Sequence, residues 1–292
     1  MALTVTTNLS SLIVQNNLNK ATNSLNKAIE RMTTGYKINH AKDNAAGYSI
    51  ADVWTTKLGS IDVASQNTAM GLDLLQTAEE NYSLIISHFQ RVRDLTEQAA
   101  NGTYGTTSLE AIKQEITARF DEIDRISASA EYNDIKLMNN TGAIKLQVGI
   151  KDDTNSQIEL VEDLFKKADL ATLTTSDVTG LTDAKYAKTR ANLITFATTT
   201  AKAPDQLLVI DKIIENLSDR VTKIGAAQNR VESAMETLNT QSQNITSSLS
   251  TLKDTDVAQE SSNYIKAQIL QQASATLLST ANQAPSIALN LL

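Results

Sequence analysis

The sequence predicts a mainly α-helical fold: an elongated antiparallel coiled-coil or helical-bundle rod with a β-hairpin, plus a terminal two-helix coiled coil. The chain has only two prolines and ten glycines in 292 residues, which favours long uninterrupted helices. Apolar residues recur over long stretches with alternating spacings of three and four, which is typical of coiled coils. Aromatic residues make up only 4% of the chain, so the core must be built mainly from aliphatic side chains.

The two ends of the chain carry similar helical patterns. The N-terminal pattern consists of Val14, Leu18, Ala21, Leu25, Ala28 and Met32. The C-terminal pattern consists of Ile265, Ile269, Leu270, Ala273, Leu277 and Ala281. We therefore expect the two terminal helices to pair through these residues.

Two further helices are predicted in the first half of the chain. The first has a seam of Leu75, Ala78, Tyr82, Ile85, Phe89, Val92, Thr96 and Ala99. It is expected to stop at Gly102 and Gly105, with Ser108 as the N-cap of the next helix. That helix has a seam of Leu109, Ile112, Ile116, Phe120, Ile123 and Ile126.

A β-hairpin is predicted at about 143–162. Ile144, Leu146 and Val148 alternate with polar residues, as do Ile158 and Leu160, and a polar turn separates the two runs. Residues 166–203 lack clear periodicity and are expected to form a short surface connector.

The longest seam lies in the second half. Twelve of its fourteen positions are apolar: Leu207, Ile210, Ile214, Leu217, Val221, Ile224, Gln228, Val231, Met235, Leu238, Ser242, Ile245, Leu249 and Leu252. A pattern sustained over more than six heptads predicts a coiled-coil helix roughly 69 Å long at about 1.5 Å per residue.

Both tails lack charge. No charged residue precedes Lys20, and none follows Lys266, yet both tails are rich in amides and hydroxyls. Burial of the eight leucines and isoleucines after Lys266 is expected to be too little to offset the entropy of ordering that segment alone. We therefore expect both tails to be disordered in the free protein and to fold against other copies.

The composition disfavours several classes of function. A net charge of −7 argues against nucleic-acid binding, and no apolar run is long enough to span a membrane. The N-terminus does not have the pattern of a secretory signal peptide. With no cysteine, two histidines and no nucleotide-binding or nucleophile motif, we expect no enzymatic activity, no metal site and no cofactor.

Two motifs resemble the ends of bacterial flagellins. The stretch "RMTTGYKINHAKDNAAGYSI" is similar to their N-terminal signature, and Gly35, Asn39, Asp43 and Gly47 mark its loop. The stretch "DTDVAQESSNYIKAQILQQASATLLSTANQAP", followed by a terminal Leu-Leu, is similar to their C-terminal region. The resemblance covers roughly residues 1–165 and 205–292, in the correct order.

The resemblance implies a three-part organisation. Residues 1–42 and 255–292 would form the terminal coiled coil of an inner tube that lines an export channel. Residues 43–165 and 204–254 would form the helical rod, and 166–203 a short variable region in place of a large outer domain. Polymerisation would then use the tail residues Val14, Leu18, Leu25, Met32, Ile265, Ile269, Leu270, Leu277, Leu291 and Leu292.

The resemblance also implies partners and a location. The chain would be a secreted, extracellular subunit of the flagellar filament that serves motility. Other copies of itself, the flagellar export apparatus, a flagellin chaperone, and the hook-associated junction and cap proteins would be its partners. Nucleic acid and membrane are not expected as partners.

A second implied partner is the vertebrate innate immune receptor Toll-like receptor five. "QRVRDLTEQAANG" resembles the flagellin segment that this receptor recognises, with Arg91, Leu95 and Glu115 at the matching positions. Arg91 and Leu95 are one helical turn apart and off the seam of Phe89, Val92 and Thr96, so they are expected to form a binding patch. The same face could instead pack against a neighbouring subunit.

Two alternatives remain open from the sequence. A hook–filament junction protein shares weaker similarity at both ends of the chain. A flagellin with an enzymatic insertion, such as a metallopeptidase, would need a histidine cluster that the middle region does not contain.

Overall fold

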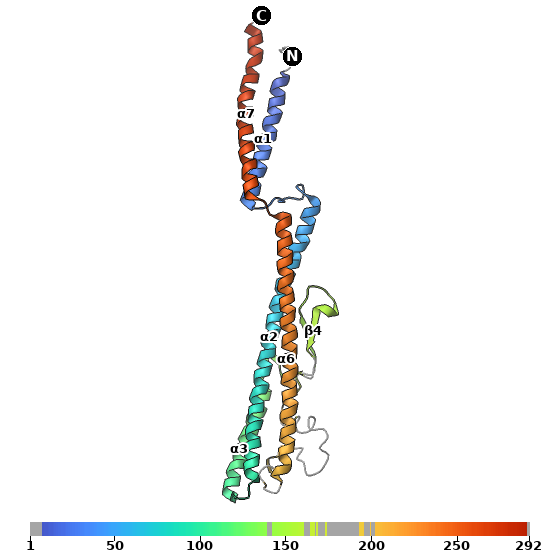
Figure 1. The fold of residues 1–292 in the computed structure, drawn as a ribbon, viewed down its shortest axis with the longest axis vertical. Coiled ribbons are helices and arrows are strands. Elements are labelled where there is room, and N and C mark those ends of the chain that lie inside the picture. Colours follow the sequence, from blue (N-terminus) through green and yellow to red (C-terminus); the bar gives the residue numbers. More distant parts are fainter. Residues whose placement is uncertain are drawn as a thin grey trace. The chain divides into compact units, whose positions relative to one another are not determined.

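The computed structural model describes residues 8–138, 142–160, 164–166, 168, 173, 193–195, 199 and 202–290, with side chains up to 283. The predicted connector at 166–203 lies mostly outside the described residues. Five long helices dominate: α1 (Leu9–Thr34), α2 (Ala45–Ala100), α3 (Thr106–Ser129), α6 (Ala203–Lys253) and α7 (Val257–Asn290). Long packed helices with small antiparallel hairpins confirm the predicted fold class (Figure 1).

The chain forms two compact units. One comprises Met1–Gly59 with Ser242–Leu292, and the other comprises Ser60–Gln241. The boundaries between the units lie inside α2, after Gly59, and inside α6, after Gln241. The sequence-based borders were placed at residues 42 and 255. The loop after α1 bonds to the end of α6, where the Lys37 amide donates to the Lys253 carbonyl at 2.7 Å, and this contact joins the end of α6 to the terminal helices.

The central unit has a continuous aliphatic core. All eight predicted seam residues of α2 from Leu75 to Ala99 are buried, as are the predicted residues of α3 from Ile112 to Ile126. In α6 one set of buried residues from the predicted seam is spaced seven apart: Ile210, Leu217, Ile224, Val231 and Leu238. The rings of Phe89 and Phe120 join α2 to α3, with their centroids 6.2 Å apart. The central coiled-coil seams are therefore confirmed.

The predicted hairpin is confirmed. Strands β3 (Ile144–Gln147) and β4 (Gln157–Leu160) are antiparallel, with Ile144 opposite Leu160 and Leu146 opposite Ile158. The short helix η1 (Thr154–Ser156) precedes β4. Leu146 packs on α2 at Gly71, where a Cβ atom would lie 2.5 Å from the leucine Cδ1. Glycine at position 71 therefore permits this close approach, and a side chain there would force Leu146 to move.

Two local features differ from the sequence-based expectation. The helix α3 begins at Thr106 with Gly105 as its N-cap, so the assignment of Ser108 as N-cap was wrong. A second hairpin of β1 (Glu131–Tyr132) and β2 (Ile135–Lys136) was not predicted. Its turn residues Asn133 and Asp134 have φ angles of 47° and 64°, which asparagine and aspartate tolerate better than most residues.

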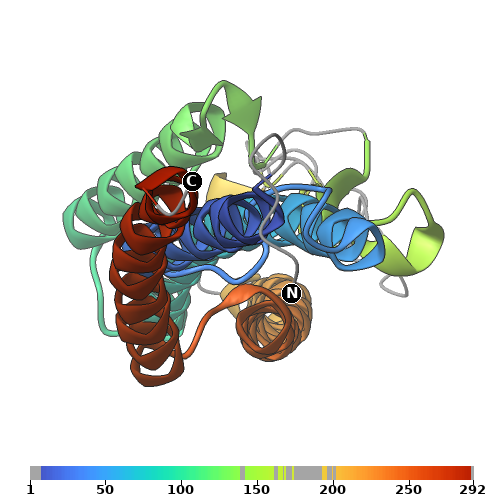
Figure 2. The same cartoon turned by 90° about the horizontal axis from the view of Figure 1, so that it is seen from above.

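The terminal helices α1 and α7 lie side by side in the other unit, which confirms that the two ends pair (Figures 1 and 2). On α1 the contact surface follows the predicted pattern, with Ala21 and Ala28 buried and Val14, Leu18 and Leu25 partly buried. Met32 is the exception, because 37% of its surface is exposed.

On α7 the predicted contact residues were wrong except for Ala281, which is partly buried. Ile265, Ile269, Leu270 and Leu277 are between 49% and 59% exposed. The residues turned inward are instead spaced four and three apart: Glu260, Tyr264, Ala267, Gln271, Ser274, Leu278 and Ala281. These are mainly small or polar side chains, so apolar content alone pointed to the wrong face of the helix.

Candidate functional site

The loop between α1 and α2 begins at a left-handed glycine. Gly35 has φ 76° and caps α1, and its amide donates to the Arg31 carbonyl at 2.9 Å. Residues with a side chain adopt this conformation at a cost, so glycine favours the turn. The Gly35 carbonyl then accepts from the Thr255 amide at 2.9 Å, just before α7.

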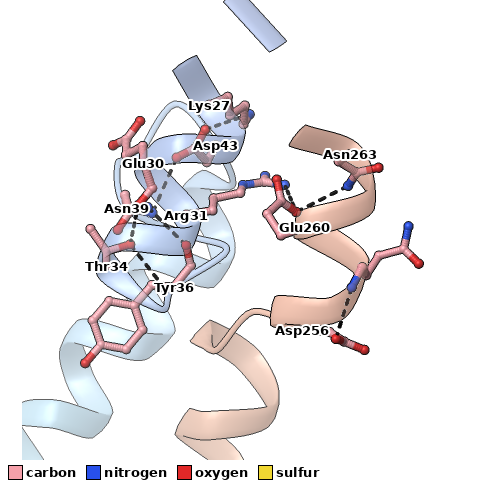
Figure 3. Close-up of polar contacts among 11 residues, drawn as sticks. Lys27, Glu30, Arg31, Thr34, Tyr36, Asn39, Asp43, Asp256, Glu260 and Asn263 are labelled. Atoms are coloured by element: carbon pink, nitrogen blue, oxygen red, sulfur yellow. Dashed lines mark hydrogen bonds and ion pairs between the residues drawn. The ribbon is translucent and has the colours of Figure 1, made fainter. Parts of the chain in front are cut away.

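Asp43 organises the rest of this loop. Its carboxylate accepts from the amides of Asn39 at 3.4 Å and His40 at 3.2 Å, and it lies 2.9 Å from the Lys27 ammonium. The hydrogen bond from Lys27, followed by the backbone bond from His40, lowers the pKa of Asp43 to about 2. Asn39 donates to the Tyr36 carbonyl at 3.0 Å and closes the turn (Figure 3).

Gly47 allows the tight start of α2. The Asn44 side chain accepts from the Gly47 amide at 3.0 Å and acts as the N-cap. A Cβ atom at Gly47 would lie 2.8 Å from Asn44 Nδ2 and 2.9 Å from Ile38 Cδ1. The four signature residues therefore build one structured loop between α1 and α2.

This loop is joined to the connection between α6 and α7. Tyr36 and Asp254 form an isolated antiparallel bridge, and the Lys253 ammonium lies 4.3 Å from the centre of the Tyr36 ring. Asp256 caps α7, since its carboxylate accepts from the amides of Ala258 and Gln259. The two distant ends of the sequence thus meet at one polar junction (Figure 3).

A charged pair lies between α1 and α7. Arg31 Nη1 is 3.8 Å from Glu260 Oε2, which also accepts from the Asn263 amide group at 3.3 Å (Figure 3). The Glu260 side chain is 8% exposed, and Arg31 Nε is buried without a hydrogen-bond partner among the described residues. Sequence analysis missed this pair, although Glu260 stands seven residues before Ala267, in the phase of the true seam.

Further hydrogen bonds between α1 and α7 come from polar side chains. Gln271 donates to Thr22 at 3.1 Å, Asn8 donates to the Ala281 carbonyl at 2.7 Å, and Ser11 donates to Asn282 at 2.7 Å. A groove of about 720 Å³ runs between the two helices and includes Leu270 and Leu277 among its lining residues. The pairing therefore leaves large apolar side chains of α7, Ile265, Ile269, Leu270 and Leu277, about half exposed.

Large apolar side chains on both helices remain exposed in the pair. Those on α1 are 54–60% exposed near its start: Leu9, Leu12 and Ile13. Those on α7 are 49–59% exposed: Ile265, Ile269, Leu270 and Leu277. Contiguous exposed apolar surface of this kind is characteristic of protein-interaction sites.

The predicted receptor residues Arg91 and Leu95 differ in their exposure to solvent. Arg91 is exposed, and its Nε donates to Glu115 Oε1 on α3 at 2.8 Å. This bond lowers the pKa of Glu115 and raises the pKa of Arg91. Leu95 is only 2% exposed and belongs to the core, so the expectation that it lies off the buried surface beside Arg91 was wrong. Val92, Leu95, Thr96 and Ala99 are all buried, and their spacings of three and four residues place them on one face of α2, so the buried stripe is wider than the predicted seam and includes Leu95.

Within the described residues, no group of histidine, cysteine, aspartate and glutamate side chains could hold a metal ion. Among the helices described, none is both long and apolar enough to cross a membrane. Leu291 and Leu292, predicted to act in polymerisation, lie outside the described residues.

Comparison with known proteins identifies the family. Residues 5–143 match the bacterial flagellin N-terminal helical region, and residues 207–292 match the bacterial flagellin C-terminal helical region. The chain is 34% identical to the flagellin of Bacillus subtilis (strain 168), with 98% of each chain covered. It is 33% identical to the flagellin of Listeria monocytogenes, with 99% of each covered.

Among solved structures, the crystal structure of Bacillus cereus flagellin matches with a TM-score of 0.46 at 24% identity, over 59% of this chain and 88% of that one. Both family regions occur in their expected order, and the curated relatives match over nearly their whole length. The chain therefore belongs to the bacterial flagellins, the structural subunits of the flagellar filament.

Proposed function

We propose that this flagellin polymerises through the exposed apolar side chains of α1 and α7. The observation that carries the proposal is the half-exposed state of Ile265, Ile269, Leu270 and Leu277 in a chain that pairs α7 with α1. Full burial of a leucine or isoleucine side chain is worth about 1.5–3 kcal/mol. Contacts between copies would therefore supply much of the stabilisation that the intramolecular pair lacks.

The absence of charge suits this role. After Lys266 no charged side chain occurs, so many copies could be packed at one radius without repulsion between like charges. Contacts between different faces of identical subunits generate an open helical polymer when the rotation between subunits does not close a ring. In this proposal the tails form the inner tube around the central channel, and Val14, Leu18, Leu25, Met32, Leu291 and Leu292 contribute to it.

The proposed assembly route is export of an unfolded chain through that channel to the extracellular end of the filament. A sequence without cysteine has no thiols that could form disulfide bonds during transit. The export apparatus, a flagellin chaperone, and the hook-associated junction and cap proteins are the proposed partners. Full-length similarity to proteins named flagellin favours this function over that of a hook–filament junction protein. No catalytic activity is proposed.

A second proposed function is recognition by Toll-like receptor five. It is supported by the exposed Arg91–Glu115 pair, which presents a fixed guanidinium on the surface of α2 and α3. Because Leu95 is buried, it would act by packing the helix rather than by contact. In a receptor-signalling assay of the monomer, Arg91→Ala should lower potency, whereas Arg125→Ala on α3 should not. Equal potency of both variants would count against this recognition.

Polymerisation is tested with one matched pair of variants. Ile269 is 59% exposed on α7, and Leu208 is 51% exposed on α6 in the central unit. Loss of about 1.5–3 kcal/mol at a subunit contact should raise the critical concentration for polymerisation of Ile269→Ser about tenfold or more. Leu208→Ser should polymerise more nearly like the parent chain. Unchanged polymerisation of Ile269→Ser would contradict the proposal.

A further inference from the structure

The turn after α2 contains the only Asn-Gly dipeptide of the sequence, Asn101–Gly102. We propose that this turn is a site of spontaneous deamidation, with water as the only co-reactant. An asparagine side chain is converted when the backbone nitrogen of the next residue attacks its amide carbon. The conversion is therefore controlled by access to that nitrogen and by the freedom of the local backbone.

The side chain of Asn101 is already turned toward the following backbone. Its Oδ1 accepts from the Thr103 amide at 3.2 Å, and this bond closes a small ring that contains both Asn101 Cγ and the Gly102 nitrogen. The attacking nitrogen and the carbon that it must reach are thus held on the same side of the turn. The Thr103 N–H also stabilises the negative charge that develops on Oδ1 during attack.

The attacking nitrogen is accessible. Among the described residues, the Gly102 amide takes part in no backbone or side-chain hydrogen bond, so none has to break before it loses its proton. Asn101 and Gly102 are both exposed, and no neighbouring atom lies within 4 Å of the position that a Cβ of Gly102 would take. The turn between α2 and α3 can therefore adjust its backbone without disturbing the core.

Two other asparagines that the structure describes, Asn81 and Asn44, lack this combination. Asn81 lies inside α2, where its side chain donates to the Thr77 carbonyl at 2.7 Å and the helix fixes the next backbone nitrogen. The Asn44 side chain caps α2 by accepting from the Gly47 amide. Both are internal controls within the same chain.

The reaction balances without an oxidant or reductant. The Gly102 amide loses its proton to a base in solution, its nitrogen forms a bond to Asn101 Cγ, and the bond from Cγ to Nδ2 breaks with release of ammonia. Water then opens the resulting cyclic imide at either carbonyl, which yields aspartate or isoaspartate. The product adds a carboxylate next to the C-terminal end of α2, where negative charge is unfavourable to the helix dipole.

The test is incubation of the folded full-length chain in buffers of increasing pH, followed by mass spectrometry of the tryptic peptide Asp94–Lys113 and of the peptides that contain Asn81 and Asn44. Peptides with aspartate or isoaspartate in place of Asn101 should accumulate with time, and faster at higher pH, while Asn81 and Asn44 stay intact. Gly102→Ala should lose both products over the same period. Alanine fits at this position without a clash, so the variant is expected to fold normally.

Two results would overturn the proposal. One is an intact Asn101 in the folded chain under conditions in which the same chain in denaturant is converted, because the fold would then protect the turn. The other is conversion of Gly102→Ala at the parental rate, because attack by an accessible glycine nitrogen would then not control the reaction. Circular dichroism of each sample shows that the compared chains are folded.

Discussion

The helices of the two units share a heptad spacing, but they differ in which side chains they bury. In the central unit the largest aliphatic and aromatic residues, among them Tyr82, Phe89 and Phe120, face one another and are fully buried. In the terminal unit the buried positions of α7 are Glu260, Ala267 and Ser274, whereas Ile265, Ile269, Leu270 and Leu277 are between 49% and 59% exposed. The central unit thus buries its large apolar side chains within the chain, whereas the terminal unit leaves apolar side chains exposed and available for contacts with other copies. Apolar periodicity therefore identified the buried face in the central unit, where large side chains form the contact, but not on α7, where small and polar side chains form it.

The sharpest way to test this contrast is a pair of apolar truncations. Phe120→Ala should lower the free energy of unfolding of the central unit by about 3–5 kcal/mol, because it opens a cavity beside Phe89. Leu277→Ser removes a comparable apolar group, but from a side chain that is 56% exposed, so the monomer should change by less than about 0.5 kcal/mol. Urea unfolding of the monomers, followed by circular dichroism, measures both. Equal losses would show that the two units do not differ as described.

A smaller effect is expected from the charged pair of the terminal unit. Glu260→Ala leaves Arg31 beside an apolar position and should cost assembled filaments about 1–3 kcal/mol, seen as a lower dissociation temperature. Glu260→Gln keeps a hydrogen-bond acceptor for Asn263 and should cost less. If Glu260→Ala and Glu260→Gln lower the dissociation temperature equally, the Arg31–Glu260 pair does not contribute through its hydrogen bonds.

The smallest effect concerns the signature loop. The pKa of Asp43 is lowered from 3.8 to about 2, so its contribution to stability is present above the ordinary aspartate pKa and is lost as the pH falls through about 2. Removal of the ammonium in Lys27→Met should move the pKa of Asp43 back toward its ordinary value. An NMR titration of the Asp43 carboxyl group measures this shift. An ordinary pKa in the parent chain would show that the loop is not held as described.

Much of the fold could be predicted from the sequence where the deciding interactions are local or large. The seams of α2, α3 and α6 and the β3–β4 hairpin were predicted because large side chains repeat with one period and are buried within the chain. The β1–β2 hairpin was missed because two-residue strands carry almost no periodic signal, although Asn133–Asp134 is a turn signal.

The candidate site was less predictable. The phase of α7 was wrong because small residues bring the two helices together, while apolar content favoured Ile269 and Leu277. Leu95 was placed off the seam because the predicted seam was too narrow: Leu95 follows Val92 by three residues and precedes Ala99 by four, so it lies on the same buried stripe of α2. The pairing of Arg31 with Glu260 depends on the register between segments more than two hundred residues apart, which no local pattern contains.

Hydrogen exchange of α7 in two states tests the central claim most directly. Amides of residues 257–283 should exchange rapidly in dilute monomer and slowly in the polymer, because contacts between copies complete the burial of Ile265, Ile269 and Leu277. Amides of α2 around Phe89 should be protected in both states. Strong protection of α7 in the dilute monomer, or none gained on polymerisation, would contradict the claim that its exposed apolar side chains are buried by other copies.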